Sequence, residues 1–191
     1  MISVKKRRVA WGITGSGDRL SETVEVMKDV RKLYRDEVEI QIYLSKAGAQ
    51  VLKYYRLADS LKKFFDRVWV EVDANTPFLA GQLQLGRFEF LLIAPATANT
   101  VTKISTGIAD SLLSNSAIMG LKASVPVYIM PSDSREGIVV TRLPDGQDLK
   151  LRTRREDVEH VRRLSDMDYV FVLEKPEDIY SVFKKHFRNE E

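Results

Sequence analysis

The sequence contains no cysteine, and this absence excludes several kinds of chemistry at once. Disulfide bridges, thiolate catalysis, cysteine-ligated zinc and iron–sulfur clusters all require cysteine sulfur. Histidine is almost as scarce, because His160 and His186 are the only two in the chain. Both lie in charge-rich segments near the C-terminal end that we predict to be helical. We therefore expect no metal site.

Long apolar runs are missing as well. No apolar stretch reaches the roughly 20 residues that a membrane-spanning helix requires. The basic residues near the start lead into a short strand pattern and not into the apolar core of a signal peptide. These features predict a cytoplasmic protein without a membrane partner.

A strong excess of one charge is also absent. The chain has 30 basic and 27 acidic residues, which gives a formal net charge of +3. Basic residues cluster at positions 5–8, 152–155 and 184–188, but acidic residues follow the second cluster immediately. Solvated surface accounts for these clusters more simply than a nucleic-acid interface does, so we expect no nucleic-acid partner.

The pattern of apolar residues predicts one α/β domain over residues 1–191. Hydrophobic residues make up 44% of the chain, which is enough for a substantial core. Short apolar runs alternate with helical patterns, which is typical of a three-layer, Rossmann-like (flavodoxin-like) fold with a mostly parallel sheet. The predicted strands are residues 8–14, 38–44, 67–72, 88–94, 124–130 and 169–173.

Two segments depart from this alternation. Strand patterns at 137–143 and 148–152 flank Pro144-Asp145-Gly146, which predicts a β-hairpin excursion at about 137–153. Residues 73–86 are less regular and contain Gly81 and Gly86 as loose points. We expect them to form a surface loop or to reach over a ligand or a neighbouring subunit.

Small polar residues follow three of the predicted strands, and these strand ends meet at one edge of a parallel sheet. A glycine turn after the first strand can cradle a phosphate, although a plain tight turn explains it equally well. A serine after the second strand can bind a ligand or simply cap the next helix. The residues concerned are Thr14, Gly15, Ser16 and Gly17, then Ser45 and Lys46, then Pro95, Ala96, Thr97, Ala98, Asn99 and Thr100.

These residues resemble a known family, the flavoproteins that include phosphopantothenoylcysteine and lantibiotic-peptide cysteine decarboxylases and flavin prenyltransferases. The marker is Pro95-Ala96-Thr97-Ala98-Asn99-Thr100, which is similar to the family's Pro-Ala-Ser-Ala-Asn-Thr motif. Three further matches occur in the expected order: Gly12-Ile13-Thr14-Gly15-Ser16-Gly17, Ser45-Lys46-Ala47, and Lys103 with Gly107-Ile108-Ala109-Asp110-Ser111-Leu112-Leu113. Within the family the chain looks closest to archaeoflavoproteins and flavin-dependent dihydromethanopterin reductases.

The resemblance implies a noncovalently bound FMN. Thr14, Gly15, Ser16 and Ser45 would then hold the phosphate and ribityl chain, and Thr97, Ala98, Asn99 and Thr100 would lie along the isoalloxazine. Asp110 would accept a hydrogen bond from a ring N–H or cap the next helix. The rest of the implied cofactor set is Gly17, Lys46, Pro95, Ala96 and Lys103. The resemblance also implies a homo-oligomer, a trimer or a multiple of trimers, with flavin at subunit contacts.

The chain also departs from this family. The decarboxylases have a catalytic histidine upstream of the motif's proline, whereas residues 79–83 contain none. Their substrate-holding segment is replaced here by residues 130–137. The absence of these groups argues against cysteine decarboxylation and favours redox use of the flavin.

Our leading hypothesis is therefore an FMN electron carrier or reductase. It would take electrons from a ferredoxin-like donor and pass them to a carrier or a pterin-like (dihydromethanopterin) acceptor. Arg152, Arg154 and Arg155 could guide an acidic donor, although a solvated face is the simpler account of them. The alternatives are a decarboxylase or prenyltransferase of the same family, and a flavin-binding regulatory protein without turnover. The sequence assigns no catalytic residue.

Overall fold

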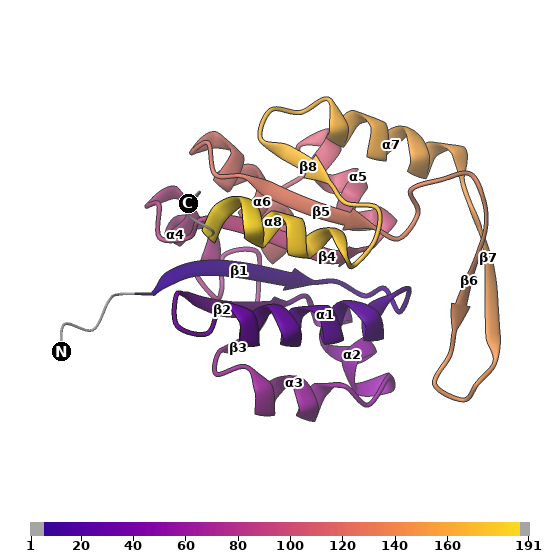
Figure 1. The fold of residues 1–191 in the computed structure, drawn as a ribbon. Helices are drawn as coiled ribbons and strands as arrows, with labels where there is room; N and C mark the ends of the chain where they lie inside the picture. The colour runs from indigo at the N-terminus through magenta and orange to yellow at the C-terminus, as the bar shows by residue number, and fades with distance from the viewer. Residues whose placement is uncertain (1–5, 188–191) are drawn as a thin grey trace.

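The computed structural model describes residues 6–187, so Lys5 and Arg188 of the predicted basic clusters lie outside the described residues. A single six-stranded sheet lies between two layers of helices (Figure 1). All neighbouring strands pair in parallel, in the order β3-β2-β1-β4-β5-β8, which confirms the predicted fold class. The strands are β1 (Arg7–Ile13), β2 (Val38–Leu44), β3 (Val68–Val70), β4 (Phe90–Ala96), β5 (Val127–Pro131) and β8 (Val170–Val172).

Side chains alternate between the two faces of the sheet and so build two separate apolar clusters. Trp11 belongs to the cluster under one helical layer, and its neighbour Ala10 belongs to the cluster under the other. The first layer consists of α1 (Leu20–Leu33), α2 (Lys46–Tyr54), α3 (Ala58–Phe64) and α8 (Asp178–Phe187). The second consists of α4 (Leu79–Gln84), α5 (Ala98–Thr106), α6 (Leu112–Lys122) and α7 (Arg155–Ser165).

The connections between strands proceed in opposite directions across the sheet on the two sides of β1. From β1 the chain proceeds to β2 and β3 on one side, and β4, β5 and β8 follow on the other side. In open α/β sheets of this kind, ligands bind outside the carboxyl ends of the strands at the point of reversal. The topology therefore predicts a ligand site at the loops that follow β1 and β4.

The predicted hairpin is present as β6 (Gly137–Arg142) and β7 (Asp148–Thr153), and it projects away from the sheet (Figure 1). Its turn contains Gly146, whose φ of 87° lies in the left-handed region. The Tyr55 hydroxyl, just beyond α2, donates a hydrogen bond to the Arg142 carbonyl at 3.2 Å. This contact holds the tip of the hairpin against the layer that contains α2.

Two local predictions were wrong. The strand predicted at 88–94 stops before Pro95, but β4 continues through Ala96. It continues because proline lacks only the backbone donor, and the Pro95 carbonyl still accepts a hydrogen bond from the Thr14 N–H. Residues 73–86 were expected to be irregular, but they contain the six-residue helix α4. Packing of Leu79 and Leu83 in the apolar core stabilises this helix despite its internal glycine.

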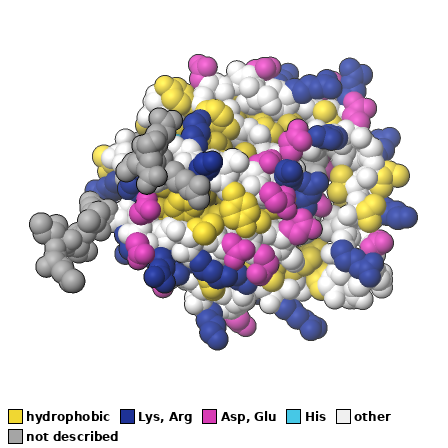
Figure 2. All heavy atoms as spheres, in the orientation of Figure 1, with side chains coloured by type: hydrophobic (Ala, Val, Ile, Leu, Met, Phe, Trp, Pro, Cys, Tyr) yellow, Lys and Arg dark blue, Asp and Glu magenta, His cyan; other side chains and the backbone are white. Residues whose placement is uncertain are grey.

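Basic and acidic side chains are interspersed over the face of the molecule that Figure 2 displays. Most ion pairs at the surface join side chains that keep much of their exposure to water, as Arg135 and Glu174 do at 2.8 Å. Such pairs contribute little to stability. Within residues 6–187, no helix has both the length and the apolar character needed to cross a bilayer.

Candidate functional site

Thr14 joins the carboxyl ends of the two strands at the point of reversal. Its hydroxyl donates to the Pro95 carbonyl at 2.9 Å and accepts from the Thr97 N–H at 2.8 Å. The side chain is almost wholly buried, with 2% of the residue exposed. Because both bonds are made within the protein, Thr14 positions Thr97 at the start of α5.

Ser132, which the sequence analysis missed, makes a second bridge at the same edge. Its N–H donates to the Ala96 carbonyl at 2.9 Å, and its hydroxyl donates to the Ser16 hydroxyl at 2.6 Å. Ser16 also accepts from the Asp18 N–H at 3.2 Å. The ends of β4 and β5 and the turn after β1 are thereby fixed to one another. The one signal in the sequence was the position of Ser132 directly after a buried strand.

Two helices begin beside this junction with side-chain caps. Ser45 caps α2 by accepting from the Gly48 N–H at 2.9 Å, and Thr97 caps α5 by accepting from the Thr100 N–H at 3.3 Å. The capping interpretation of Ser45 is therefore correct, and its hydroxyl proton is still available to a ligand. The first N–H groups of a helix have no intrahelical acceptor and carry partial positive charge, which suits an anion.

Glycine lets the start of α2 approach β1 very closely. A Cβ atom added to Gly48 would lie 2.3 Å from the carbonyl oxygen of Ile13. A Cβ added to Gly15 would lie 2.7 Å from the Cβ of Ala47. The absence of both side chains thus brings the cap of α2 next to the turn after β1.

Glu71 connects the starts of two helices, and no motif in the sequence indicated it. Its carboxylate accepts from the Lys46 N–H at 3.1 Å and from the Leu112 N–H at 2.8 Å, the first residues of α2 and α6. A negative charge at a helix start is favourable because of the helix dipole. Glu71 therefore fixes α2 relative to α6.

The remaining predicted residues occupy different settings. Pro95 and Ala96 are buried in β4 and take part through their carbonyls, whereas Lys46 and Asn99 are exposed. Lys103 pairs with Asp110 at 2.8 Å. Ser111, and not Asp110, caps α6. Lys103 and Asp110 thus form an ion pair of their own, apart from the hydrogen bonds that join the strand ends.

A cavity of about 310 Å³ lies between these strand ends and the hairpin. One wall is polar and comes from residues after β1, β4 and β5, and the opposite wall is largely apolar and comes from α2 and the hairpin. The polar wall contains Gly15, Ser16, Gly17, Asp18, Thr97, Ser132 and Asp133. The opposite wall contains Val51, Tyr54, Tyr55, Val139, Thr141, Leu143, Leu149 and Leu151.

The apolar wall follows from the register of the hairpin. Val139 pairs with Leu151 and Thr141 pairs with Leu149, so these four side chains share one face. Leu151 remains 55% exposed although it lines the cavity. Apolar surface beside fixed polar groups suits a flat, partly polar ligand.

Two carboxyl groups on the polar wall have raised pKa values. Burial raises the pKa of Asp18, and the carboxylate of Asp133 acts in the same direction. Burial also raises the pKa of Asp133, and Asp157 adds to this effect. Both groups therefore favour the neutral form more than an exposed aspartate does.

A family model described as Flavoprotein matches residues 3–184 of the chain. The chain belongs to the flavoprotein family. This membership confirms the resemblance carried by the motif Pro95-Ala96-Thr97-Ala98-Asn99-Thr100.

Three proteins of similar sequence show which members of the family this chain resembles. An uncharacterized protein of Methanocaldococcus jannaschii is 50% identical, and the match covers 94% of this chain and 95% of that protein. The dihydromethanopterin reductase (acceptor) of Methanosarcina mazei is 36% identical over 75% of this chain and 62% of its own length. The protein of the same name from M. jannaschii is 28% identical over 92% of this chain and 95% of its own length.

Solved structures agree with these relatives. Burkholderia xenovorans DmrB, determined in complex with FMN and described as a cubic protein cage for redox transfer, has a TM-score of 0.79 and 30% identity. The match covers 94% of each chain. The FMN-dependent cysteine decarboxylase SpaF has a TM-score of 0.62 and 18% identity over 94% of each chain, a likeness of fold alone.

Proposed function

We propose that this chain binds FMN in the cavity between the strand ends and the hairpin, and that it uses the cofactor to reduce an acceptor. The observation that carries the proposal is the cavity itself, with the cap of α5 and hydroxyl groups on one wall and an apolar hairpin face on the other. The relatives named dihydromethanopterin reductase and the FMN complex of DmrB support it.

The residues present fit FMN. The phosphate is a dianion, which suits the start of α2, where Ser45 has a free hydroxyl proton. The isoalloxazine is a flat ring with a polar edge, which suits a cavity lined by Thr97 on one side and Leu151 on the other.

When bound, FMN supplies hydride or single-electron chemistry. The chain's own part is to hold and shield the cofactor. Thr14 orients Thr97, and Ser132 fixes the turn after β1 through Ser16. The Tyr55 contact keeps the hairpin over the cavity, where its apolar face excludes water.

A decarboxylase mechanism finds less support. Among the described residues, neither histidine lines this cavity. His160 contacts the Ser105 hydroxyl at 2.8 Å, and His186 contacts the Tyr128 hydroxyl at 2.9 Å, so both are engaged elsewhere. Residues 79–83 lie within α4 and carry no ionisable side chain.

We also propose a homo-oligomer and a ferredoxin-like electron donor. Several apolar side chains near β3 and α4 are exposed in the single chain, which suits burial against another copy. They are Trp69, Val70, Val72, Phe78 and Leu85. The description of DmrB as a protein cage also supports a homo-oligomer. Arg152, Arg154 and Arg155 are exposed and suit an acidic donor protein, although Arg154 pairs with Asp157 and Arg155 with Glu159 in the single chain.

Anaerobic redox titration tests the proposed function. FMN-loaded protein is reduced with reduced ferredoxin and mixed with dihydromethanopterin. We expect the flavin absorbance to return as tetrahydromethanopterin forms in equal amount. A flavin that is reduced but never reoxidised by this acceptor, or by another dihydropterin, would rule out a pterin reductase.

Replacing Ser45 with alanine should weaken FMN binding about tenfold, which is about 1.4 kcal/mol. Riboflavin binding should change little, because riboflavin lacks the phosphate. Isothermal titration of both ligands measures the difference. Ser111→Ala is the matched control, since it removes a serine cap from α6 and leaves the cap of α2 in place. Equal losses for FMN and riboflavin would place Ser45 away from the phosphate.

A further inference from the structure

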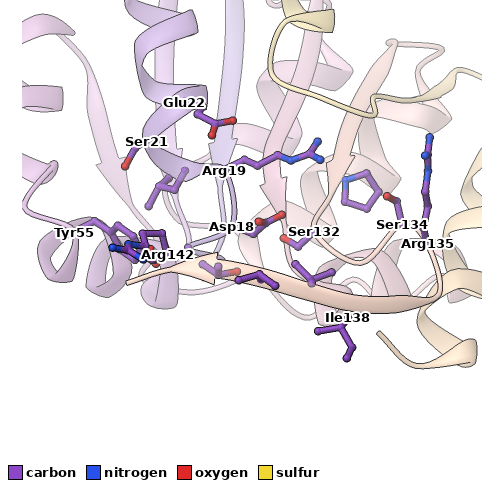
Figure 3. Close-up of a pocket in the computed structure, with 16 residues that line it drawn as sticks. Asp18, Arg19, Ser21, Glu22, Tyr55, Ser132, Ser134, Arg135, Ile138 and Arg142 are labelled. Atoms are coloured by element: carbon purple, nitrogen blue, oxygen red, sulfur yellow. The ribbon is translucent and has the colours of Figure 1, made fainter. Parts of the chain in front are cut away.

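A second and larger cavity, of about 490 Å³, adjoins the first. It lies between the first turn of α1 and the β6 strand of the hairpin, and Figure 3 displays its lining. The two cavities share several wall residues, so a molecule in one would lie against a molecule in the other. The shared residues are Gly17, Asp18, Tyr55, Ser132, Val139 and Thr141.

The lining of this larger cavity combines cations, hydroxyls and apolar side chains. Arg19, Arg135 and Arg142 come from three separate segments, and Leu20 and Val139 supply apolar surface. Arg135 and Arg142 pair with Glu174 and Asp148, neither of which lines the cavity. The apolar surface suits a flat ring, and the guanidinium groups suit a carboxylate or phosphate attached to it.

Asp18 occupies the wall between the two cavities. Its carboxyl group makes no hydrogen bond to another described residue, although its N–H is held by Ser16. Figure 3 shows Asp18 beside Ser132 in the middle of the cavity, with Tyr55 and Arg142 at one end and Arg135 at the other. The carboxyl group is therefore held at the boundary and is free to contact a ligand.

We propose that the larger cavity binds the electron acceptor, a planar nitrogen heterocycle with an anionic tail, and that Asp18 transfers a proton to a ring nitrogen. This inference rests on the proposed function. Acceptance of a hydride at the carbon of a C=N bond moves the π electron pair to nitrogen, which then needs one proton. The Asp18 carboxyl provides that proton, becomes a carboxylate, and regains a proton from water.

The charges around Asp18 agree with this role. Burial raises its pKa, Arg19 opposes the shift, and Asp133 and Glu22 reinforce it. With Asp18 neutral, the lining keeps one carboxylate, that of Glu22, against three guanidinium groups. Two of these guanidinium groups, Arg135 and Arg142, are paired with Glu174 and Asp148, so an anionic tail would bind by replacing one of these carboxylates.

Calorimetric titration of pterin-6-carboxylate, with and without FMN, tests the cavity. We expect saturable binding by the wild-type chain and at least about tenfold weaker binding by Arg142→Met. This variant keeps the backbone carbonyl that Tyr55 holds. The control Arg163→Met removes an exposed arginine on α7 and should bind like the wild type. No binding, or equal losses in both variants, would overturn the assignment of the cavity.

The role of Asp18 is tested by the pH dependence of the same titration. Wild-type binding should weaken as the pH rises and the carboxyl, whose pKa burial raises, loses its proton. Asp18→Asn cannot titrate and should lose this part of the pH dependence. In turnover, the variant should reduce the acceptor about 100-fold more slowly. An unchanged pH profile or unchanged turnover would overturn the role of Asp18.

These measurements separate the inference from the proposed function. If the probe binds as described but no acceptor is reduced, the proposed function fails and the binding site stands. If an acceptor is reduced but substitution of Arg142 and Asp18 does not change binding of the probe, the proposed function stands and the inference fails.

Discussion

Gly48→Ala should destabilise the fold by about 1–3 kcal/mol and abolish tight FMN binding, because the added methyl group overpacks a rigid contact. The new Cβ would lie 2.3 Å from the Ile13 carbonyl oxygen. Ordinary carbon–oxygen contacts are about 3.3 Å, so α2 would have to move by about 1 Å. That movement displaces the Ser45 cap from the turn after β1, where the phosphate is proposed to bind.

Chemical denaturation and FMN titration of the same samples measure the two effects. Gly120→Ala is the matched control, since it places a methyl group in a buried position of α6 with no contact closer than 3.7 Å. Alanine favours a helix over glycine, so this control should be neutral or slightly stabilising. If Gly48→Ala binds FMN as the control does, the close approach of α2 is not needed for the site.

Thr14→Val should raise the Kd for FMN at least about tenfold and cost about 1–3 kcal/mol of stability. Valine has nearly the shape of threonine but leaves the Thr97 N–H and the Pro95 carbonyl without their hydroxyl partner. The start of α5 then loses the contact that orients it. The fold should persist, because the backbone bond from the Thr14 N–H to Pro95 remains.

Thr14→Ser keeps the hydroxyl and removes only a methyl group. It should therefore bind FMN within a few-fold of the wild type, and circular dichroism should be alike for all three chains. The prediction for Thr14 is wrong if serine and valine weaken FMN binding equally, because the loss would then come from packing and not from the hydrogen bonds.

Much of the fold was predictable from local patterns. Val38–Leu44 alternates as a strand and is one, and Asp145-Gly146 marks the hairpin turn that the structure contains. The strand-end residues Thr14, Ser45 and Thr97 were also predictable, because parallel strands present their carboxyl ends at one edge. The motif from Pro95 to Thr100 then identified the family.

What the sequence did not predict depends on contacts between distant segments. Glu71 and Ser132 look ordinary in the chain, and their importance arises only when β3 and β5 place them beside helix and strand ends. Likewise, α4 is stabilised because Leu83 packs in the apolar core. A local sequence pattern does not indicate this contact. Tyr55 contacts the hairpin across a large separation in sequence.

The most direct test of the central claim is titration of the apoprotein with FMN, followed by flavin absorbance and fluorescence. We predict saturable binding of one FMN per chain, with Thr14→Val and Ser45→Ala both weaker than the wild type. The absence of saturable binding, or binding that neither substitution affects, would contradict the account of the strand-end cavity as a flavin site.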